Sequence, residues 1–82
     1  MTITLHILSP EGTLALEEVS QVSLPGMVSP FTVLPGHAAM VTALVQGEIS
    51  YRKADGSKTV VRIREGFAEV RDNKVIACVE EC

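Results

Sequence analysis

The sequence is poor in aromatic residues and in positive charge. Of its 82 residues, one is Tyr, two are Phe and none is Trp, so we expect a core built from Val, Ile, Leu and Ala. Lys and Arg number seven against ten Asp and Glu, which gives a net charge of −3. Nucleic-acid binding needs a basic footprint that displaces counterions. These few dispersed bases argue against a nucleic-acid-binding protein.

Cysteine is scarce as well, with Cys78 and Cys82 alone near the end of the sequence. If this segment is a strand, four residues at about 3.3 Å each separate the two Cα atoms by about 13 Å, beyond the roughly 7 Å limit for a disulfide. We therefore expect two free thiols and a cytoplasmic chain. Only two histidines accompany them, so we expect no metal site and no cofactor.

Long hydrophobic runs are missing. The longest near-apolar stretch, Ala38 to Val45, is far shorter than the ~20 residues that a membrane-spanning helix needs. The N-terminal residues show neither the charged region nor the apolar region of a signal peptide. We expect a soluble chain with no direct membrane insertion.

Motifs that carry catalysis are missing too. The glycines stand singly at predicted turns rather than in a phosphate-binding loop, and His37 has no Ser or Cys nucleophile motif near it. One small domain of this length can build a core but leaves little room for a deep cleft. We therefore expect no catalytic residue, and a function carried by the surface.

What the sequence does contain is alternation. Ile3, Leu5 and Ile7 alternate with polar residues, as in a half-buried strand. Asp55-Gly56 and Asp72-Asn73 favour tight hairpins. Many short strands separated by turn signals every 8 to 12 residues or so are typical of sandwiches and barrels. We predict an all-β fold in a single domain over residues 1–82: an antiparallel β-sandwich or flattened barrel of about ten short strands.

The sequence also predicts where the strands are interrupted and which one is central or covered. We expect Glu17-Glu18 to interrupt the second strand at an edge or bend, with Val19 resuming the apolar contacts, and Glu65-Gly66 to form a turn between two other strands. The last strand has apolar residues on both faces, which is typical of a central or covered strand. The strands before and after Glu17-Glu18 are expected at Leu14–Leu16 and Val22–Leu24. Those before and after Glu65-Gly66 are expected at Thr59–Arg64 and Phe67–Val70, and the last strand is expected at Lys74–Glu81.

Residues 31–42 mark a candidate functional surface. Phe31 to Leu34 is predicted to be a short, largely buried strand that Pro35-Gly36 ends in a sharp turn. His37 at this corner is either a histidine satisfied by the local backbone or a polar group that faces a partner. In the preceding loop, Met27 and Val28 either fold back onto the core or form an exposed apolar tip that docks on a partner.

Four parts of the sequence resemble a known family. They are the opening Leu5–Gly12, the segment Val33–Ala38 with its Pro-Gly-His-Ala motif, Gly47 leading into a strand, and Gly66–Val70 followed by Asn73 and Val75. In these parts the chain resembles the N-terminal β-sandwich of the epsilon subunit of bacterial F-type ATP synthases, over essentially its whole length. The resemblance implies a ten-stranded sandwich with no chemistry of its own.

The resemblance also implies that the chain is a subunit of a larger complex, the proton-translocating ATP synthase. The domain is expected at the foot of the central stalk, on the cytoplasmic face of the bacterial inner membrane. There it would bind the gamma subunit and the c-ring, reach the catalytic alpha/beta hexamer indirectly, and couple proton flow to rotation and ATP synthesis. Carried over by position, the gamma interface comprises Ser9, His37, Met40 and Thr42, and the c-ring interface comprises Met27, Val28, Ser29, Pro30 and Phe31.

The sequence departs from the family pattern at two places. The ring-facing loop of the family often carries Gly and an acid, whereas this loop reads Met27-Val28-Ser29-Pro30, so we expect a more apolar contact. Many family members continue into a C-terminal helical hairpin that inhibits ATP hydrolysis and in some members binds ATP. The sequence stops after its last predicted strand, so we predict neither property.

The rival interpretation is a free-standing β-barrel adaptor or ligand-binding module without a rotary partner. An adaptor needs one exposed apolar patch, whereas a stalk subunit needs two. As a further expectation, Met40→Asp should leave the fold intact and weaken binding to gamma.

Overall fold

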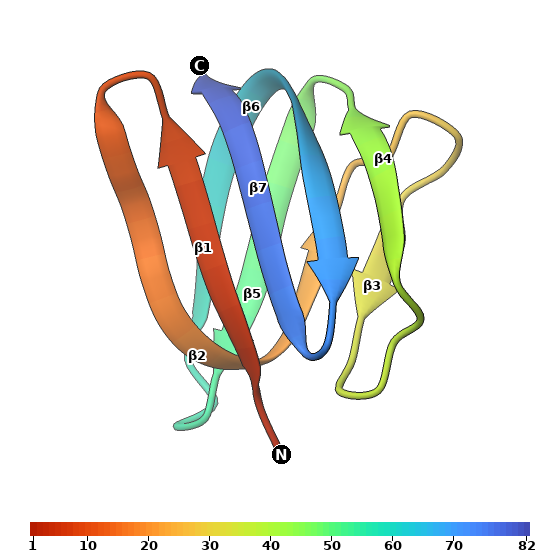
Figure 1. The fold of residues 1–82 in the computed structure, drawn as a ribbon. Helices are drawn as coiled ribbons and strands as arrows, with labels where there is room; N and C mark the ends of the chain where they lie inside the picture. The colour runs from red at the N-terminus through yellow and green to blue at the C-terminus, as the bar shows by residue number, and fades with distance from the viewer.

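Seven β-strands and no helix make up the computed structural model, which describes all 82 residues. The all-β prediction is therefore confirmed, and the structure holds no helix that could cross a membrane. The strands are β1 (Ile3–Ser9), β2 (Gly12–Leu24), β3 (Phe31–Val33), β4 (Met40–Leu44), β5 (Gly47–Lys53), β6 (Lys58–Arg71) and β7 (Lys74–Glu81) (Figure 1).

The strands form two layers, as predicted for a sandwich. The strand order is β1-β7-β6-β5-β2-β3, with β4 added on β6 and a further pairing between β1 and β2 that closes the sheet. We call β4, residues 66–71 of β6, β7, β1 and residues 12–19 of β2 the front sheet, which faces the viewer in Figure 1. Residues 58–63 of β6, β5, residues 19–24 of β2 and β3 form the back sheet.

The number of strands differs from the predicted ten because β2 and β6 are long and bent. Glu17-Glu18 lies within β2, just before the irregularity between Val19 and Gln21 where the strand passes from one sheet to the other. The expected bend is therefore present, but the strand continues through it. The Glu17 side chain lies at the end of the sandwich, where its carboxylate accepts a 2.9 Å hydrogen bond from Tyr51 and pairs with Lys53 at 2.8 Å. Glu18 accepts hydrogen bonds from Thr2 and Thr4. Two consecutive glutamates can thus lie inside a continuous strand when other residues bind their carboxylates.

The predicted turn at Glu65-Gly66 is also wrong, because this position is a bulge within β6. The pairing register with β7 shifts between Ile63 and Glu65, and such a shift bends a strand without ending it. A Cβ atom at Gly66 would collide with the carbonyl oxygen of Cys78. The glycine therefore permits close approach of β7 rather than a reversal of the chain.

The core is aliphatic, as the composition predicted. Seventeen buried hydrophobic residues form one cluster, and Tyr51 is its only aromatic member. The alternating residues Ile3, Leu5 and Ile7 are all 0% exposed. No buried residue is polar or charged, so every polar side chain is left for the surface.

Strand β7 is central but not covered. It pairs in parallel with β1 and antiparallel with β6, which confirms the central position. Its second face lies open, since Ile76 is exposed and Cys78 is half-buried. Of the two alternatives that the sequence left open, a central or a covered strand, the structure shows the central one.

The turns follow their predicted chemistry. Asp72 and Asn73 have φ values of 51° and 59°, as a tight hairpin requires, and Gly56 supplies a φ of 90° in the β5–β6 hairpin. Strand β3 occupies Phe31–Val33 as expected. Its burial was overestimated, because Val33 is buried while Leu34 just beyond the strand is 52% exposed.

Candidate interaction surfaces

The outer face of the front sheet carries a contiguous apolar patch. Its side chains lie in two rows that run across the paired strands. One row joins Ala43, Phe67, Cys78 and Leu8, and the other joins Val41, Glu69, Ile76, His6 and Leu16. We call the apolar members the front patch: Leu8, Leu16, Val41, Ala43, Phe67, Ile76 and Cys78.

Strict alternation places these side chains outside. On β6, Ala68 and Val70 are buried while Phe67 is 54% exposed, and on β7 the buried Ala77 stands beside the outward Ile76. Val41 on β4 is 70% exposed. A contiguous row of exposed large apolar residues is the usual mark of a contact surface.

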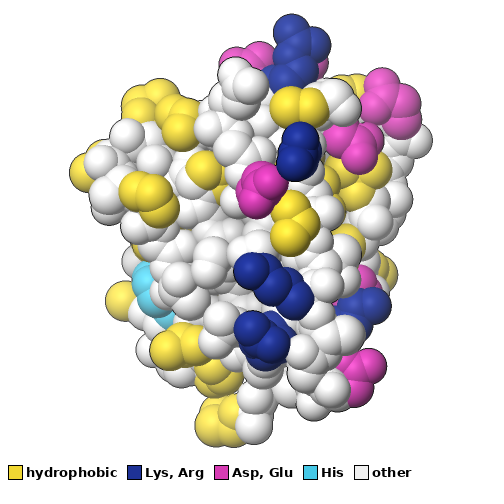
Figure 2. Space-filling model, turned by 180° about the vertical axis from the view of Figure 1, so that it is seen from behind, with side chains coloured by type: hydrophobic (Ala, Val, Ile, Leu, Met, Phe, Trp, Pro, Cys, Tyr) yellow, Lys and Arg dark blue, Asp and Glu magenta, His cyan; other side chains and the backbone are white.

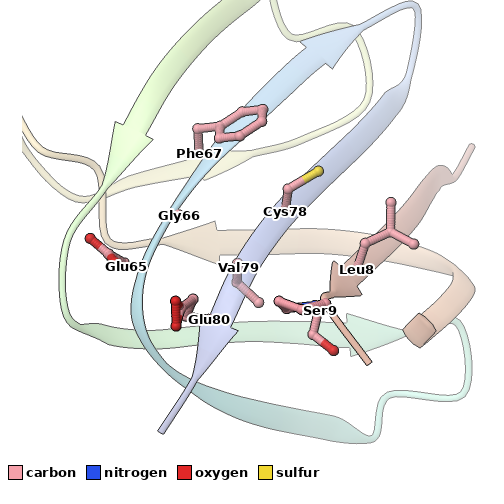
Figure 3. A pocket seen from close by; sticks show the side chains of 9 residues that line it. Leu8, Ser9, Glu65, Gly66, Phe67, Cys78, Val79 and Glu80 are labelled. Atoms are coloured by element: carbon pink, nitrogen blue, oxygen red, sulfur yellow. The ribbon is translucent and has the colours of Figure 1, made fainter. Parts of the chain in front are cut away.

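A groove of about 520 Å³ opens at one end of the front patch. It lies where the ends of β1 and β7 meet the bulge inside β6 (Figure 3). Leu8, Phe67 and Cys78 give it apolar walls, and the carboxylates of Glu65 and Glu80 stand together at one side (Figure 3). The groove therefore combines apolar contact area with negative charge.

The residues expected at the gamma interface do not lie together. Ser9 lines the groove at the end of β1, where its hydroxyl bonds the carbonyl of Gly12. His37 lies in the loop between β3 and β4, beside the β6–β7 turn, because its neighbour Gly36 bonds Asn73. The His37 ring bonds the Ala38 carbonyl through Nδ1 at 2.7 Å, so a local backbone partner is present. Ser9 and His37 mark opposite ends of the front sheet.

Met40 and Thr42 point inward on β4. They stand opposite the buried residues Val70 and Ala68, and Met40 packs against the core cluster. This packing counts against the expectation that Met40→Asp leaves the fold intact, because the substitution would place a carboxylate against apolar residues. Val41, directly between Met40 and Thr42, is the exposed side chain of this strand.

The residues expected at the c-ring interface do form one unit, the loop between β2 and β3. Met27 is 63% exposed and Val28 is 94% exposed, so these side chains do not fold back onto the core. Figure 2 shows hydrophobic side chains gathered at the edge of the molecule where this loop projects. Ser29 and Pro30 are also exposed, whereas Phe31 is half-buried. We call residues 27–30 the apolar tip.

The base of the apolar tip is well anchored. The Met27 amide donates to the Ala43 carbonyl and the Val45 amide donates to the Pro25 carbonyl, both at 2.9 Å. The Phe31 ring packs on Gly26, where an added Cβ would lie 2.9 Å from ring carbons. The exposed side chains are thus presented from a fixed support.

The outer face of the back sheet is polar and basic. Ser23, Ser50 and Thr32 form a row of hydroxyls across β5, β2 and β3, and Arg52 lies opposite Lys58. Figure 2 views this side and shows Lys and Arg side chains along its middle. The two faces of the sandwich therefore differ in composition: the outer face of the front sheet carries the rows of apolar side chains, and the outer face of the back sheet carries mostly polar ones.

The titrating groups with shifted pKa values stabilise the end of the sandwich. Hydrogen bonds from Lys53 and then Tyr51 lower the pKa of Glu17, and those from Thr4 and Thr2 lower the pKa of Glu18. Burial and the bond to Glu17 raise the pKa of Tyr51. The described residues contain no group of three or more His, Cys, Asp or Glu that could hold a metal ion.

Sequence reasoning missed most of the front patch. The signal was available for Ile76 and Cys78, whose outward position on the last strand follows from alternation with Val75 and Ala77. It was not available for Phe67, because the turn expected at Glu65-Gly66 left the direction of the next side chain undefined.

Known proteins similar to this chain fall in one group. Residues 2–82 match the family described as "ATP synthase, Delta/Epsilon chain, beta-sandwich domain". The ATP synthase epsilon chain of Campylobacter fetus is 39% identical over 96% of this chain and 61% of its own length. That of Sulfurovum sp. is 41% identical over 93% of this chain and 59% of its own length. The chain thus spans about three fifths of these relatives.

Solved structures agree with the sequence matches. A chain in the Euglena gracilis mitochondrial ATP synthase, in a structure of OSCP, F1 and the c-ring, superposes with a TM-score of 0.91 at 26% identity. The match covers 98% of this chain and 51% of that one. A chain in the central stalk and c-ring of the Tetrahymena thermophila enzyme superposes with a TM-score of 0.80 at 15% identity, over 99% of this chain and 65% of that one. The second match supports the fold alone.

Proposed function

The chain belongs to the beta-sandwich domain family of ATP synthase delta and epsilon chains, and from this premise we propose that it serves in the central stalk of a proton-translocating F-type ATP synthase. In that role it binds the gamma subunit and the c-ring and transmits rotation between them. It carries no catalytic residue of its own, and the complex as a whole is the enzyme.

The observation that carries this proposal is the presence of two exposed apolar surfaces on one body. The front patch lies on the outer face of a sheet, and the apolar tip projects from the loop between β2 and β3. An adaptor with one partner needs only one such surface, whereas a rotor subunit must hold two partners at once. The arrangement therefore favours the stalk subunit over the adaptor.

We assign the gamma subunit to the front patch and to the residues at its two ends. Ser9 borders the groove and His37 borders the β6–β7 turn, so the interface runs the length of the front sheet. Met40 and Thr42 support it from within β4, while Val41 makes the contact. Phe67 suits this role, because aromatic residues including Phe are enriched at the buried centre of protein interfaces.

We assign the c-ring to the apolar tip, residues Met27, Val28, Ser29 and Pro30, with Phe31 as the anchor behind them. The tip carries no charge, so the contact depends on burial of apolar area. Such a domain would sit peripherally on the cytoplasmic face of the bacterial membrane, and it would reach the alpha/beta hexamer through gamma.

The test is calorimetric titration of the purified chain with the gamma subunit from the same organism. We expect saturable one-to-one binding that Val41→Asp weakens at least about tenfold, because it buries a carboxylate in an apolar contact. The matched control is Val60→Asp, which places the same charge on an exposed valine of the back sheet. Absence of binding by the folded chain would refute the gamma assignment, and equal losses in both variants would remove the front patch from it.

A further inference from the structure

Two pairs of like charges face each other across the β6–β7 hairpin. Glu65 stands opposite Glu80 at one end of the paired region, and Arg71 stands opposite Lys74 at the other. All four side chains are exposed on the same outer face as the front patch. None of them forms an ion pair or a side-chain hydrogen bond: the ion pairs of the structure join Lys53 to Glu17 and Arg62 to Glu48.

Like charges directly opposite each other destabilise an antiparallel pair, and opposite charges stabilise it. Exchanging Glu80 and Lys74 would turn both repulsive pairs into attractive ones with no change in composition. The hairpin therefore carries its charges in the arrangement that is less favourable for the free domain. Glu69 is the nearest acid between the pairs, and it pairs with neither base within ion-pair distance.

The apolar part of the front patch lies between the two charged pairs. Arg71 lies six positions after Glu65 on β6, which at about 3.3 Å per residue corresponds to about 20 Å. Phe67, Ile76 and Cys78 occupy this interval, with Glu69 as the one charged residue among them. From one end of the hairpin to the other, the face thus carries a pair of acids, a mainly apolar stretch that includes Glu69, and a pair of bases.

The groove at the Glu65–Glu80 end of the front patch could bind a cationic side chain of a partner. Leu8, Phe67 and Cys78 line it, and Glu65 and Glu80 stand at its side. Lys and Arg side chains pack their aliphatic stems on apolar surface and keep their charged groups in water, and attraction to a carboxylate favours a position beside an acid. A cationic side chain entering this groove would meet both features and would relieve the repulsion between the two glutamates.

We propose that the front patch selects a partner segment of matching polarity: apolar in the middle, cationic where it meets Glu65 and Glu80, and anionic where it meets Arg71 and Lys74. This inference rests on the proposed function, in which that segment belongs to the gamma subunit. The two like-charge pairs are then recognition elements whose repulsion in the free domain is relieved by the partner.

The test compares stability and binding in the same variants. Glu80→Lys places a positive charge opposite Glu65, and Lys74→Glu places a negative charge opposite Arg71. We expect each to raise the melting temperature of the free chain and to weaken gamma binding about tenfold or more, because a like charge then faces the partner. A purely structural role predicts that binding follows stability, so the opposite signs identify recognition.

The back sheet supplies the matched control. Arg52 stands opposite Lys58 in a third like-charge pair, although the Arg52 guanidinium also donates to the Gly56 carbonyl. Lys58→Glu should raise the melting temperature in the same way and leave gamma binding unchanged. Glu80→Gln, which only removes a charge, provides a second variant if Glu80→Lys does not fold.

The outcomes separate this inference from the proposed function. If the wild-type chain binds gamma, Val41→Asp abolishes binding, and Glu80→Lys and Lys74→Glu bind as the wild type does, then the front patch is the interface and the charge inference is overturned. If the folded wild-type chain does not bind gamma, the proposed function fails and the inference fails with it.

Discussion

The backbone N–H of Gly36 donates a 2.7 Å hydrogen bond to Oδ1 of Asn73. The Asn73 carbonyl also accepts the amide of Thr4 at 3.0 Å, so one residue of the β6–β7 turn joins the start of β1 to the corner between β3 and β4. The corner is itself closed by the bond from the His37 amide to the Leu34 carbonyl at 3.1 Å. The position of His37 therefore depends on a residue 36 positions away along the sequence.

Replacement of Asn73 should loosen this corner. Asn73→Gly removes the side-chain bond and keeps the positive φ of the turn, so we expect a loss of about 1 kcal/mol in the free energy of unfolding. Asn73→Ala should cost about 1 kcal/mol more, because alanine is strained at φ near 59°. Urea unfolding measures both values, and amide hydrogen exchange at Gly36 should accelerate in each variant. Unchanged exchange at Gly36 would contradict the proposed link.

A negative charge on the apolar tip should separate the two proposed interfaces. Val28 is 94% exposed, so Val28→Asp should change the free energy of unfolding by less than about 0.5 kcal/mol. We expect it to weaken binding to detergent-solubilised c-ring and to leave gamma binding unchanged. The reverse pattern, with gamma binding lost and c-ring binding kept, would exchange the two assignments. Val60→Asp again serves as the control of equal charge.

Gly66→Ala should destabilise the domain strongly even though the substitution adds only a methyl group. The new Cβ would collide with the Cys78 carbonyl and lie 2.9 Å from the Val79 Cα, and backbone atoms cannot move aside without displacing β7. We expect a loss of about 2 to 3 kcal/mol, measured by urea unfolding. Ala43→Gly, which removes a methyl group from a half-buried strand position, should cost only about 1 kcal/mol.

The carboxylates at the end of the sandwich should make stability fall in acid. The pKa values of Glu17 and Glu18 are lowered from an ordinary value of 4.5. A group with a depressed pKa in the folded state binds protons more weakly there than in the unfolded chain. Its contribution is therefore complete above about pH 4.5 and is lost as the pH falls through the folded-state pKa.

Urea midpoints measured between about pH 6 and pH 3 should show this loss, and the slope should be smaller in Glu17→Gln. Lys53 and Tyr51, which bind the Glu17 carboxylate, affect stability at high pH instead. The pKa values of Lys53 and Tyr51 are raised, so their contributions hold at neutral pH and disappear as the pH rises through the folded-state values. An equal acid slope in Glu17→Gln and the wild type would exclude Glu17 as a source.

The sequence was sufficient for the fold class, for the alternating strand Ile3–Ser9 and for the continuously apolar strand Lys74–Glu81. It was not sufficient for the continuity of β2 and β6. A bend inside a strand and a turn between strands draw on the same residue types, charged residues and glycine, and the hydrogen bonds that distinguish them come from distant segments. Glu17 lies in β2 opposite Leu5, and its carboxylate is bound by Tyr51 and Lys53 from distant segments.

The structure shows which way the side chains of the candidate interface residues point, and on β4 the residues chosen from the sequence point inward. Positions carried over by resemblance selected Met40 and Thr42, whereas the exposed residue is Val41 between them. A shift of one residue in a strand exchanges its two faces. Side-chain direction on a five-residue strand is fixed by its pairing with β6, and this pairing is not visible in the local sequence.

The passage of β2 and β6 through both layers determines how the domain responds to load. Residues 58–63 of β6 pair in the back sheet and residues 66–70 pair in the front sheet, with no loop between them. A force applied to the front patch is therefore carried into the opposite layer along the covalent backbone, and the two layers cannot slide past each other without stretching it. Neither sheet can detach alone, so the domain should yield to pulling in a single step rather than layer by layer.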